Sequence, residues 1–373
     1  MPPVNKGLEG VVVADTALSE VDGENGRLTY VGYQIADLAE HATFEEVVHL
    51  LFHGHLPNRT ELAQFNADLA RHRSLPPGVL DVLRAMPVAS EPMDVLRTGA
   101  SAASAALRFT SPVTIEQGMA LIAVFPTIVA AFDRIRRGLE PLAPRADLSH
   151  AANYLYLLSG TVPSEQQTKA LDTYLILTAD HSMNASTFTA RVIASTLSDM
   201  GSSIVGAIGA LKGPLHGGAP ALVLAMLKEI GTPDNAEAWI TNALDHGVRL
   251  MGFGHRVYKT EDPRAKVLRK LAERTSEIDF FKLATQVEDV ALRQLHERKP
   301  QNRLYTNVEF YSAAVMHGVG LADDLFTPTF AVSRVSGWTA HVLEQVKENR
   351  LIRPSSTYVG PLDLVAVPLD QRP

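Results

Sequence analysis

Two histidines lie in glycine-rich segments, where a ligand could approach the chain closely. His216 stands in KGPLHGGAP and His255 in MGFGHRVYK. Because glycine has no side chain, backbone and ligand can come near an imidazole, which donates a hydrogen bond while it is neutral. Either residue alone could be a loop histidine that only satisfies nearby carbonyls. Together they favour a cleft lined with neutral hydrogen-bond donors.

A single carboxylate, Glu309, lies in TNVEFYSAAV at the expected start of a helix. With Asn307 as N-cap, Glu309 falls in the first turn, where free N–H groups and the helix dipole stabilise a negative charge. Helix capping alone explains this position. The same dipole would also help to keep a general base ionised, so a structural and a catalytic role are both open at this point.

Two arginines occupy positions that local preferences do not favour. In TEDPRAKVLRKL, Asp262 is expected as N-cap and Pro263 as the first helical residue, so Arg264 opposes the dipole in the first turn. Arg334 lies in the apolar stretch FAVSRVSGW, where a guanidinium normally needs an anionic partner. Both positions suggest binding of an anion, whereas Arg353, in the extended segment LIRPSS, means little alone.

The segment HLLFHGH is the obvious candidate for a metal site. His49 and His53 are one helical turn apart, His55 follows, and Glu45 and Glu46 precede them. However, the segment lacks the HExxH order, and histidines near a helix end are favoured by the dipole without any metal. We therefore expect no metal site here.

The composition limits the class of protein. The 373 residues exceed one core of typical size, which predicts two domains or one large domain with a lobe. A net charge of −7 without a basic tract argues against nucleic acid as a partner. The chain has no cysteine and no signal-peptide pattern, and its longest apolar run, 119–132, is broken by Pro126. We expect a soluble, cytoplasmic protein without a membrane span.

The spacing of apolar residues predicts an all-α protein with one β-hairpin. The hairpin is expected within residues 10–33, around the turn-forming cluster DGENG. Helical stretches are predicted at 60–72, 78–85, 93–108, 114–136, 148–159 and 165–198. In the second half the same spacing recurs in APALVLAMLKEIG, NAEAWITNALDHGVRL, PRAKVLRKLAER, FFKLATQVEDVALRQLHER and PTFAVSRVSGWTAHVLEQVKEN.

Taken in order, these motifs resemble the citrate synthase family, of the short bacterial and archaeal type. The resemblance runs from GLEGVVVADTALSEVDGENGRLTYVGY through LSHAANYLYLL, ADHSMNASTFTARVIAST, GALKGPLHGGAP, MGFGHRVYKTEDPRAKVL, NVEFYSAAV and RVSGWTAHVLEQ to LIRPSSTYVGP. It implies a homodimer of an almost wholly helical two-domain fold. The large domain would comprise 1–218 and 322–373, and the small domain, 219–321, would close over the active site. HLLFHGHLP is similar to a family segment with no metal role.

The resemblance implies condensation of acetyl-CoA with oxaloacetate and hydrolysis to citrate and CoA, without metal or further cofactor. His216 would bind the acetyl thioester oxygen, His255 the oxaloacetate carbonyl, and Glu309 would remove the methyl proton. The expected oxaloacetate-binding residues are His181, Arg264, Arg334 and Arg353, the last reaching the partner subunit's site. The expected CoA-binding residues are Leu250, Met251, Gly252, Phe253, Gly254, Arg256 and Lys259.

Two residues depart from the commonest family pattern. Pro220, in HGGAP, replaces an asparagine, and Glu309 stands where most members have aspartate. The acyl group stays open, because relatives that use propionyl-CoA to make 2-methylcitrate share the catalytic set, and one methylene is worth only about 1 to 3 kcal/mol. A non-catalytic helical homologue is the alternative of another class. The chain lacks the N-terminal extension of the longer, NADH-inhibited members, so we expect no inhibition by NADH.

Overall fold

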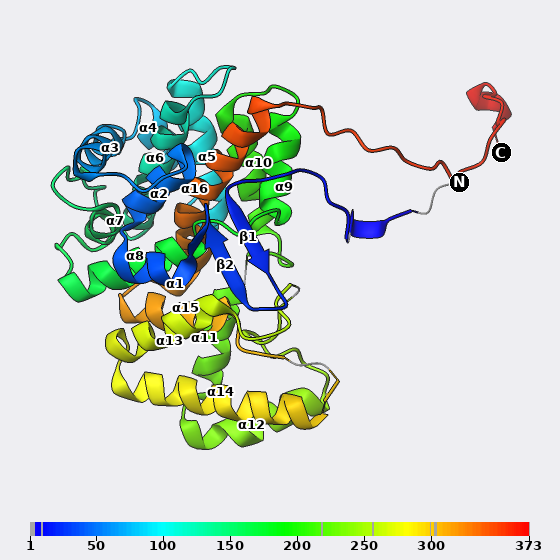
Figure 1. Cartoon of the computed structure of the whole chain (residues 1–373). Coiled ribbons are helices and arrows are strands. Elements are labelled where there is room, and N and C mark those ends of the chain that lie inside the picture. Colours follow the sequence, from blue (N-terminus) through cyan, green and yellow to red (C-terminus); the bar gives the residue numbers. More distant parts are fainter. Residues whose placement is uncertain are drawn as a thin grey trace.

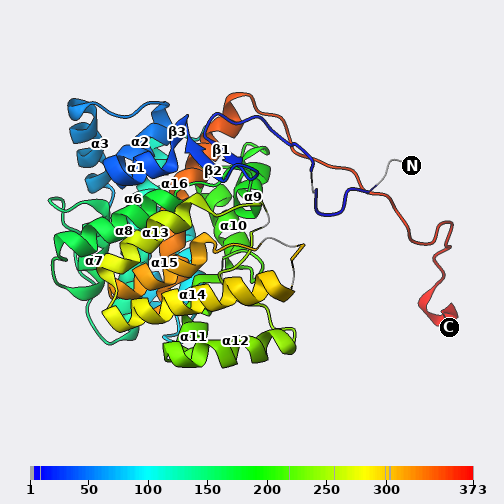
Figure 2. The ribbon, with the colours of Figure 1, turned by 60° about the horizontal axis from the view of Figure 1, so that its bottom comes forward.

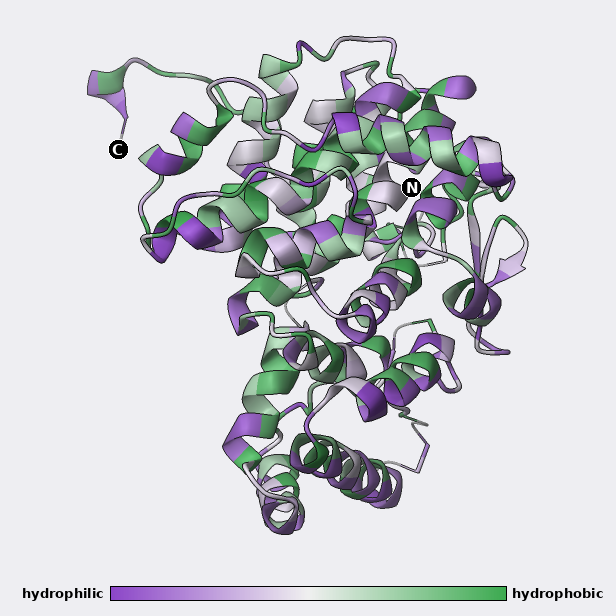
Figure 3. Cartoon of the chain, turned by 90° about the vertical axis from the view of Figure 1, so that its left-hand side faces the viewer, coloured by the Kyte–Doolittle hydropathy of each residue, from purple (hydrophilic) through white to green (hydrophobic). Residues whose placement is uncertain are grey.

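The computed structural model describes residues 4–8, 10–217, 219–255, 257–298, 300–301 and 304–372. These residues form sixteen α-helices and one small three-stranded sheet (Figure 1). Figure 3 shows hydrophobic and hydrophilic residues alternating along the helices, as expected for helices with one buried face. The predicted all-α class with a small N-terminal hairpin is confirmed.

The upper body in Figure 1 is built mainly from the helices of the first half of the chain. They are α1 (Ile35–His41), α2 (Phe44–His53), α3 (Arg59–Arg71), α4 (Val79–Ala85), α5 (Pro92–Ala106), α6 (Ile115–Arg136), α7 (His150–Ser159), α8 (Glu165–Thr178), α9 (Ala185–Ala194) and α10 (Met200–Lys212). The five predicted stretches from 60–72 to 148–159 each correspond to one of these helices.

A second group of helices lies below this body in Figure 1. It contains α11 (Ala219–Ile230), α12 (Ala236–Asp245), α13 (Pro263–Thr275), α14 (Ile278–Arg298) and α15 (Val308–Gly318). The chain then returns through the upper body as α16 (Phe326–Lys347). The predicted domain boundaries at 218/219 and 321/322 agree with this path and stay a prediction.

Helix α6 forms the centre of the upper body. All its residues from Gly118 to Asp133 are buried. By length and composition it could cross a membrane, with a mean hydropathy of 1.7 over eighteen residues, but 83% of that window is buried inside the fold. Among the described residues, no other helix is both long enough and apolar enough to cross a membrane. The apolar run thus forms a buried helix in the core of the fold.

The sheet is a hairpin extended by one short strand. Strands β1 (Ser19–Asp22) and β2 (Arg27–Tyr30) pair in antiparallel fashion, with Ser19 opposite Tyr30, and β3 (Tyr33–Gln34) pairs with β2. The turn is tightened by Asp22, whose side chain accepts the N–H of Asn25 at 3.0 Å. The predicted hairpin is confirmed, and β3 was not predicted.

The prediction of one helical stretch over 165–198 is wrong. Helix α8 ends at Thr178, and α9 begins at Ala185 after an irregular segment. The break is stabilised by distant groups, because the Asp180 N–H donates to the Tyr30 hydroxyl at 3.1 Å, and the Tyr30 hydroxyl donates to the Asp180 carbonyl at 2.9 Å. Asn184 caps α9 by accepting two backbone N–H groups. These tertiary contacts outweigh the helical periodicity of the sequence.

Candidate active site

Six of the seven residues expected to catalyse the reaction or to bind oxaloacetate come together from five separate segments of the chain. They are His181, His216, His255, Arg264, Glu309 and Arg334. The ring centroids of His181 and His255 lie 5.4 Å apart. The positive charge of Arg264 or Arg334 acts on the pKa of each histidine and of Glu309. The fold therefore forms one cluster from widely spaced motifs.

The segments that precede His255 and Glu309 pair as an isolated antiparallel bridge. The N–H of Asn307 donates to the Gly252 carbonyl at 3.0 Å, and its side-chain amide donates to the Gly254 carbonyl at 2.9 Å. The side-chain oxygen of Asn307 accepts the N–H of Glu309 at 3.2 Å, so the predicted N-cap is confirmed. The bridge fixes the His255 imidazole and the Glu309 carboxylate relative to each other.

The hydrogen bonds of His255 define its tautomer. Its Nδ1 accepts the N–H groups of Val257, at 3.0 Å, and Tyr258, at 3.1 Å. A ring nitrogen that accepts carries a lone pair, so the proton of the neutral ring lies on Nε2. Burial, helped by the charge of Arg264, lowers the pKa of His255 to about 4. His255 can therefore donate a hydrogen bond from Nε2 while uncharged.

Arg264 is buried together with its counter-ion. Its Nε and one terminal nitrogen donate to the two carboxylate oxygens of Asp262 at 3.0 and 2.8 Å, and only 3% of Arg264 is exposed. Burial opposes the charge, but Asp262 more than compensates and raises the pKa of Arg264. Asp262 also caps α13 and accepts the N–H of Val308 at 3.2 Å. One carboxylate thus neutralises Arg264 and joins the starts of α13 and α15.

Arg334, on α16, is buried without such a partner. It is 2% exposed, and its Nε donates to the Thr178 carbonyl at 2.7 Å. Within the described part of the chain no carboxylate forms an ion pair with it, and burial lowers the pKa of Arg334 despite the nearby charge of Asp180. Burying an unpaired cation is costly, and an anionic ligand would remove that cost.

His181 lies in the break between α8 and α9, which is held by the buried Asp180. The Nε2 of His341 lies 3.3 Å from the Asp180 carboxylate, and the Nδ1 of His341 lies 3.0 Å from Arg191. Because arginine can only donate, His341 Nδ1 accepts, and its Nε2–H donates to Asp180. Burial alone would raise the pKa of Asp180, but His341, Arg334 and Ser19 lower it to about 2.

His181 itself is an uncharged imidazole. Burial lowers its pKa well below the usual value, and both site arginines act in the same direction. Its Nε2 lies 3.3 Å from the Tyr258 hydroxyl. The residue can therefore exchange one hydrogen bond with a ligand without contributing charge.

His216 contacts Ser186, near the start of α9. Its Nε2 lies 2.8 Å from the Ser186 hydroxyl oxygen, which also accepts the indole N–H of Trp338 at 3.0 Å. The hydroxyl proton can go to His216 or to the side-chain oxygen of Asn184, which already accepts two backbone N–H groups. Donation to His216 is therefore favoured, and it leaves the imidazole proton on Nδ1. Burial, with Arg334, lowers the pKa of His216 to about 4.

Glu309 has one carboxylate oxygen, Oε2, that is buried and has no hydrogen-bond partner. Burial raises the pKa of Glu309, and the charge of Arg264 opposes this only partly. The sequence analysis expected the first helical turn to favour the ionised form, but burial outweighs the cap. A buried, unpartnered carboxylate oxygen with a raised pKa is a good proton acceptor.

The residues expected to bind CoA are only partly accessible. Leu250 and Phe253 are buried, and the Gly252 and Gly254 carbonyls already accept hydrogen bonds from Asn307. Met251 is half-buried and Lys259 is exposed. Arg256 lies outside the described residues. The CoA contacts stay a prediction.

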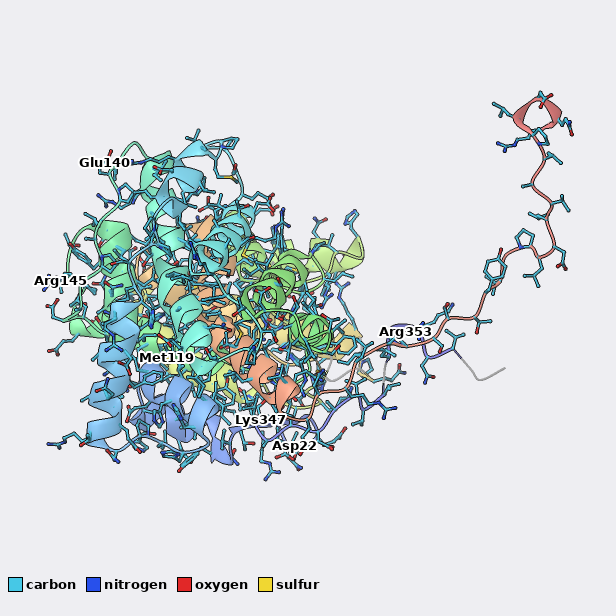
Figure 4. The ribbon with its side chains drawn as sticks, turned by 90° about the horizontal axis from the view of Figure 1, so that it is seen from above. Asp22, Met119, Glu140, Arg145, Lys347 and Arg353 are labelled. Atoms are coloured by element: carbon cyan, nitrogen blue, oxygen red, sulfur yellow. The ribbon has the colours of Figure 1, made fainter. Side chains whose placement is uncertain are left out.

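Arg353 does not join the cluster within its own chain. It is exposed on the segment that follows α16. Figure 4 shows Arg353 on an arm that leads away from the helical body.

Four residues that hold the cluster were not predicted from the sequence: Asp180, Ser186, Trp338 and His341. A local signal existed for the first two, because the polar run ADHSMNAS interrupts an otherwise apolar stretch and Asn is a common N-cap. The roles of Trp338 and His341 depend on contacts with distant segments, so no local pattern indicates them.

This arrangement is typical of an enzyme that binds an anionic substrate and removes a proton from carbon: three neutral imidazoles, one buried carboxylate and two guanidinium groups. The sequence model of the family described as "Citrate synthase, C-terminal domain" matches residues 7–355. "Citrate synthase" of Haloferax volcanii is 46% identical over 382 residues, covering 99% of each chain. "2-methylcitrate synthase 2" of Corynebacterium glutamicum is 42% identical over 382 residues, covering 99% of this chain and 98% of that protein.

A solved structure is similar over the same extent. The ternary complex of carboxymethyl coenzyme A and oxaloacetate with citrate synthase from Thermoplasma acidophilum has a TM-score of 0.92 and 34% identity, covering 99% of this chain and 100% of that one. This chain belongs to the citrate synthase family, and it is accordingly an acyltransferase.

Proposed function

We propose that this protein is a citrate synthase, which condenses acetyl-CoA with oxaloacetate and hydrolyses the product to citrate and CoA. The observation that carries the proposal is the combination of two uncharged donors, His216 Nδ1–H and His255 Nε2–H, with the unpartnered Oε2 of Glu309. Proton removal beside a carbonyl needs a base and a donor acting together.

In the first step Glu309 takes a proton from the methyl group of acetyl-CoA. A thioester methyl is a very weak acid, so the developing enolate oxygen needs a hydrogen bond at the same moment. His216 supplies it from Nδ1, and Ser186 holds the ring through Nε2. The pKa of His216, lowered to about 4, keeps this donor neutral at pH 7.

In the second step the enol carbon attacks the carbonyl carbon of oxaloacetate. The His255 Nε2–H polarises this carbonyl and supplies the proton of the new hydroxyl group, and the proton taken up by Glu309 then returns His255 to its neutral form. Arg264, Arg334 and His181 bind the two carboxylates, and the unpaired charge of Arg334 is the strongest attraction for one of them. Water then cleaves the thioester and releases the CoA thiol.

Domain movement is part of the proposal. Arg264 and Arg334 are 3% and 2% exposed, so a substrate can reach them only if the cluster opens. The predicted small domain, 219–321, carries His255, Arg264 and Glu309, and its motion would admit substrates and then exclude water.

We also propose a homodimer in which Arg353 acts in the partner subunit's site. The terminal segments 4–8, 10–17 and 351–372 extend from the body (Figures 1 and 2). The second arm exposes large apolar side chains that a partner would cover: Leu351, Tyr358, Val359, Leu362, Leu364, Val365 and Leu369. We expect no further cofactor and a cytoplasmic location.

Mixing two inactive variants tests this arrangement. A hybrid dimer of Glu309→Gln and Arg353→Gln subunits contains one site with an intact base and an intact arginine only if Arg353 crosses the interface. Co-refolding both variants should therefore restore activity, whereas each variant alone stays inactive. Absence of rescue in a dimer confirmed by light scattering would place Arg353 in its own subunit's site.

The reaction is tested by release of CoA thiol. A thiol reagent detects it without background, because the protein has no cysteine. We expect oxaloacetate-dependent release that is faster with acetyl-CoA than with propionyl-CoA. A several-fold preference for propionyl-CoA would make the protein a 2-methylcitrate synthase, the activity named for the Corynebacterium relative. No release with either thioester at saturation would favour a non-catalytic helical homologue.

A further inference from the structure

Three potential metal ligands converge at the corner between α2 and α3, apart from the active-site cluster. His49 lies on α2, His55 in the connection, and Glu61 in the first turn of α3. One nitrogen of each histidine and one oxygen of Glu61 all lie within 4.8 Å of one another. The sequence alone predicts no metal site in this segment, and Glu61 is not part of that prediction.

The two acidic residues that the sequence placed next to these histidines are used elsewhere. Glu45 accepts the N–H of His150 at 2.7 Å, and Glu46 forms the capping box with Thr43. The carboxylate at the corner comes instead from the next helix.

Each of the three residues has its other polar atom held by a backbone group. The Nδ1 of His49 lies 3.1 Å from the His55 carbonyl, and the Nδ1 of His55 lies 3.2 Å from the His53 carbonyl. Since a carbonyl only accepts, both Nδ1 atoms carry protons and the lone pairs lie on Nε2. Oε2 of Glu61 accepts the Asn58 N–H at 2.8 Å, so Oε1 is the oxygen that can bind a metal ion. Histidines and carboxylates that bind metals are oriented in this way by their surroundings.

Two of the remaining atoms, on His55 and Glu61, form an electron-rich pair beside His49. The Nε2 of His55 lies 3.5 Å from the Oε1 of Glu61. With the proton of neutral His55 on Nδ1, two lone pairs face each other, and a positive species between them would stabilise the arrangement. A proton on His55 would satisfy this pair alone, whereas a metal ion could also draw in His49, which has one ring nitrogen within 4.8 Å of the other two ligand atoms.

We propose that His49, His55 and Glu61 bind Zn²⁺ or a chemically similar divalent transition-metal ion, with water as a further ligand. Two imidazoles and one carboxylate are ligands that Zn²⁺ prefers, at distances of about 2.0 to 2.2 Å. His49 is buried and fixed, while the side chains of His55 and Glu61 are 55% and 40% exposed and can rotate inward. The ion would fasten the end of α2 to the start of α3.

The site is structural rather than catalytic. Figure 1 shows α3 at the edge of the upper body, away from α13 and α15. Because binding to the folded state stabilises it, Zn²⁺ should raise the melting temperature of the protein without changing CoA release.

The test uses the full-length protein stripped of metal with a chelator and titrated with zinc chloride alone at pH 7.5. We expect about one Zn²⁺ per chain in isothermal titration calorimetry, and about 10-fold or greater weakening in His55→Ala and in Glu61→Gln. Glu61→Gln is informative because glutamine keeps the capping-box acceptor. His41→Ala removes an exposed histidine at the end of α1 and serves as the matched control.

Either of two results would overturn the proposal. One is unchanged Zn²⁺ affinity in both His55→Ala and Glu61→Gln. The other is no binding at concentrations up to about 100 μM, which would leave the corner as an ion pair between His55 and Glu61. Equal CoA release by His55→Ala and the unchanged protein, with a zinc-dependent rise in melting temperature only in the latter, would support it.

Discussion

Arg264 and Arg334 lie in the same cluster, yet one is buried with a counter-ion and the other without. Arg264 belongs to the α13 wall, which we define as residues 252–255, 257–264 and 305–309. Arg334 belongs to the α16 wall, defined as residues 178–186 and α16. Asp262 neutralises the first guanidinium, whereas the second contacts the Thr178 carbonyl and the Phe330 ring and has only the more distant carboxylate of Asp180 near it.

The two walls are also braced differently. The α13 wall is held by backbone pairing and by Asp262, which bonds to groups at the starts of α13 and α15. The α16 wall is held by buried side chains: Arg191 bonds to His341, and His341 bonds to Asp180. Arg264 therefore contributes both to the stability of the fold and to substrate binding. Arg334 serves substrate binding but lowers the stability of the fold until an anion binds to it.

The largest effect should follow a change of Glu309 in the α13 wall. Glu309→Gln removes the proton acceptor but keeps the size of the side chain, and Asn307 still caps α15, so we expect kcat to fall by about 10³-fold or more with an unchanged melting temperature. Glu309→Asp should keep the chemistry but lose about 100-fold, because the carboxylate is withdrawn by about one bond. Full activity in Glu309→Gln, measured by CoA release, would leave Glu309 as a helix cap only.

The contrast between the walls predicts stability changes of opposite sign. Arg264→Met leaves Asp262 buried and unpaired, so the free energy of unfolding should fall by about 3 to 5 kcal/mol. Arg334→Met removes an unpaired buried cation, so the melting temperature should stay equal or rise. Both variants should raise the KM for oxaloacetate by about 100-fold or more, because each loses a charge-assisted contact.

Calorimetry together with oxaloacetate kinetics distinguishes the two cases. Arg264→Met combined with Asp262→Asn is the control, since it removes both charges and should recover part of the lost stability. If Arg264→Met and Arg334→Met destabilised the fold equally, the proposed difference between the walls would be wrong.

Much of the α13 wall could be predicted from the sequence, because its organisation is local. Asp262 and Asn307 are N-caps that immediately precede their helices, and both assignments are confirmed. The position of Arg264 against the dipole indicated an unusual role, and the adjacent carboxylate explains how it is tolerated.

The α16 wall was less predictable, because its bonds connect residues far apart in the chain. The apolar period of 165–198 suggested one helix, and only the contacts of Tyr30 with Asp180 show why the chain breaks there. In the sequence, His341 is an ordinary polar residue on a long helix. Only the structure shows that its two ring nitrogens contact Arg191 and Asp180. Helix propensity and the spacing of apolar residues describe an isolated helix. The end of α8 and the contacts of His341 depend instead on packing against distant segments.

A smaller effect is expected in the α16 wall at Ser186, a positioning residue for His216. Ser186→Ala removes the hydrogen bond that fixes the imidazole tautomer, which should lower kcat by about 10-fold and leave the KM for oxaloacetate unchanged. Thr189→Ala, on the same helix, is the control, because the Thr189 hydroxyl only donates to its own helix. A change in the KM for oxaloacetate with unchanged kcat would contradict the role assigned to Ser186.

The smallest effect should come from the β-hairpin, which contacts both walls. Ser19 and Tyr30 bond to Asp180 in the α16 wall, while the Gly23 carbonyl accepts the N–H of Lys259, in the α13 wall, at 2.9 Å. Figure 1 shows the β1–β2 turn directed toward the loops before α13. A shift of one wall can therefore move the other wall through the hairpin.

Gly23→Ala tests this connection, because a Cβ at Gly23 would lie 2.2 Å from the Val257 carbonyl oxygen, and backbone must shift to relieve the clash. Val257 donates its N–H to His255 Nδ1, so we expect a several-fold increase in the KM for oxaloacetate and a smaller change in kcat. Glu24→Ala, at an exposed position of the same turn, should behave as the unchanged protein. Equal kinetics in Gly23→Ala and Glu24→Ala would mean that the two walls are positioned independently of the hairpin.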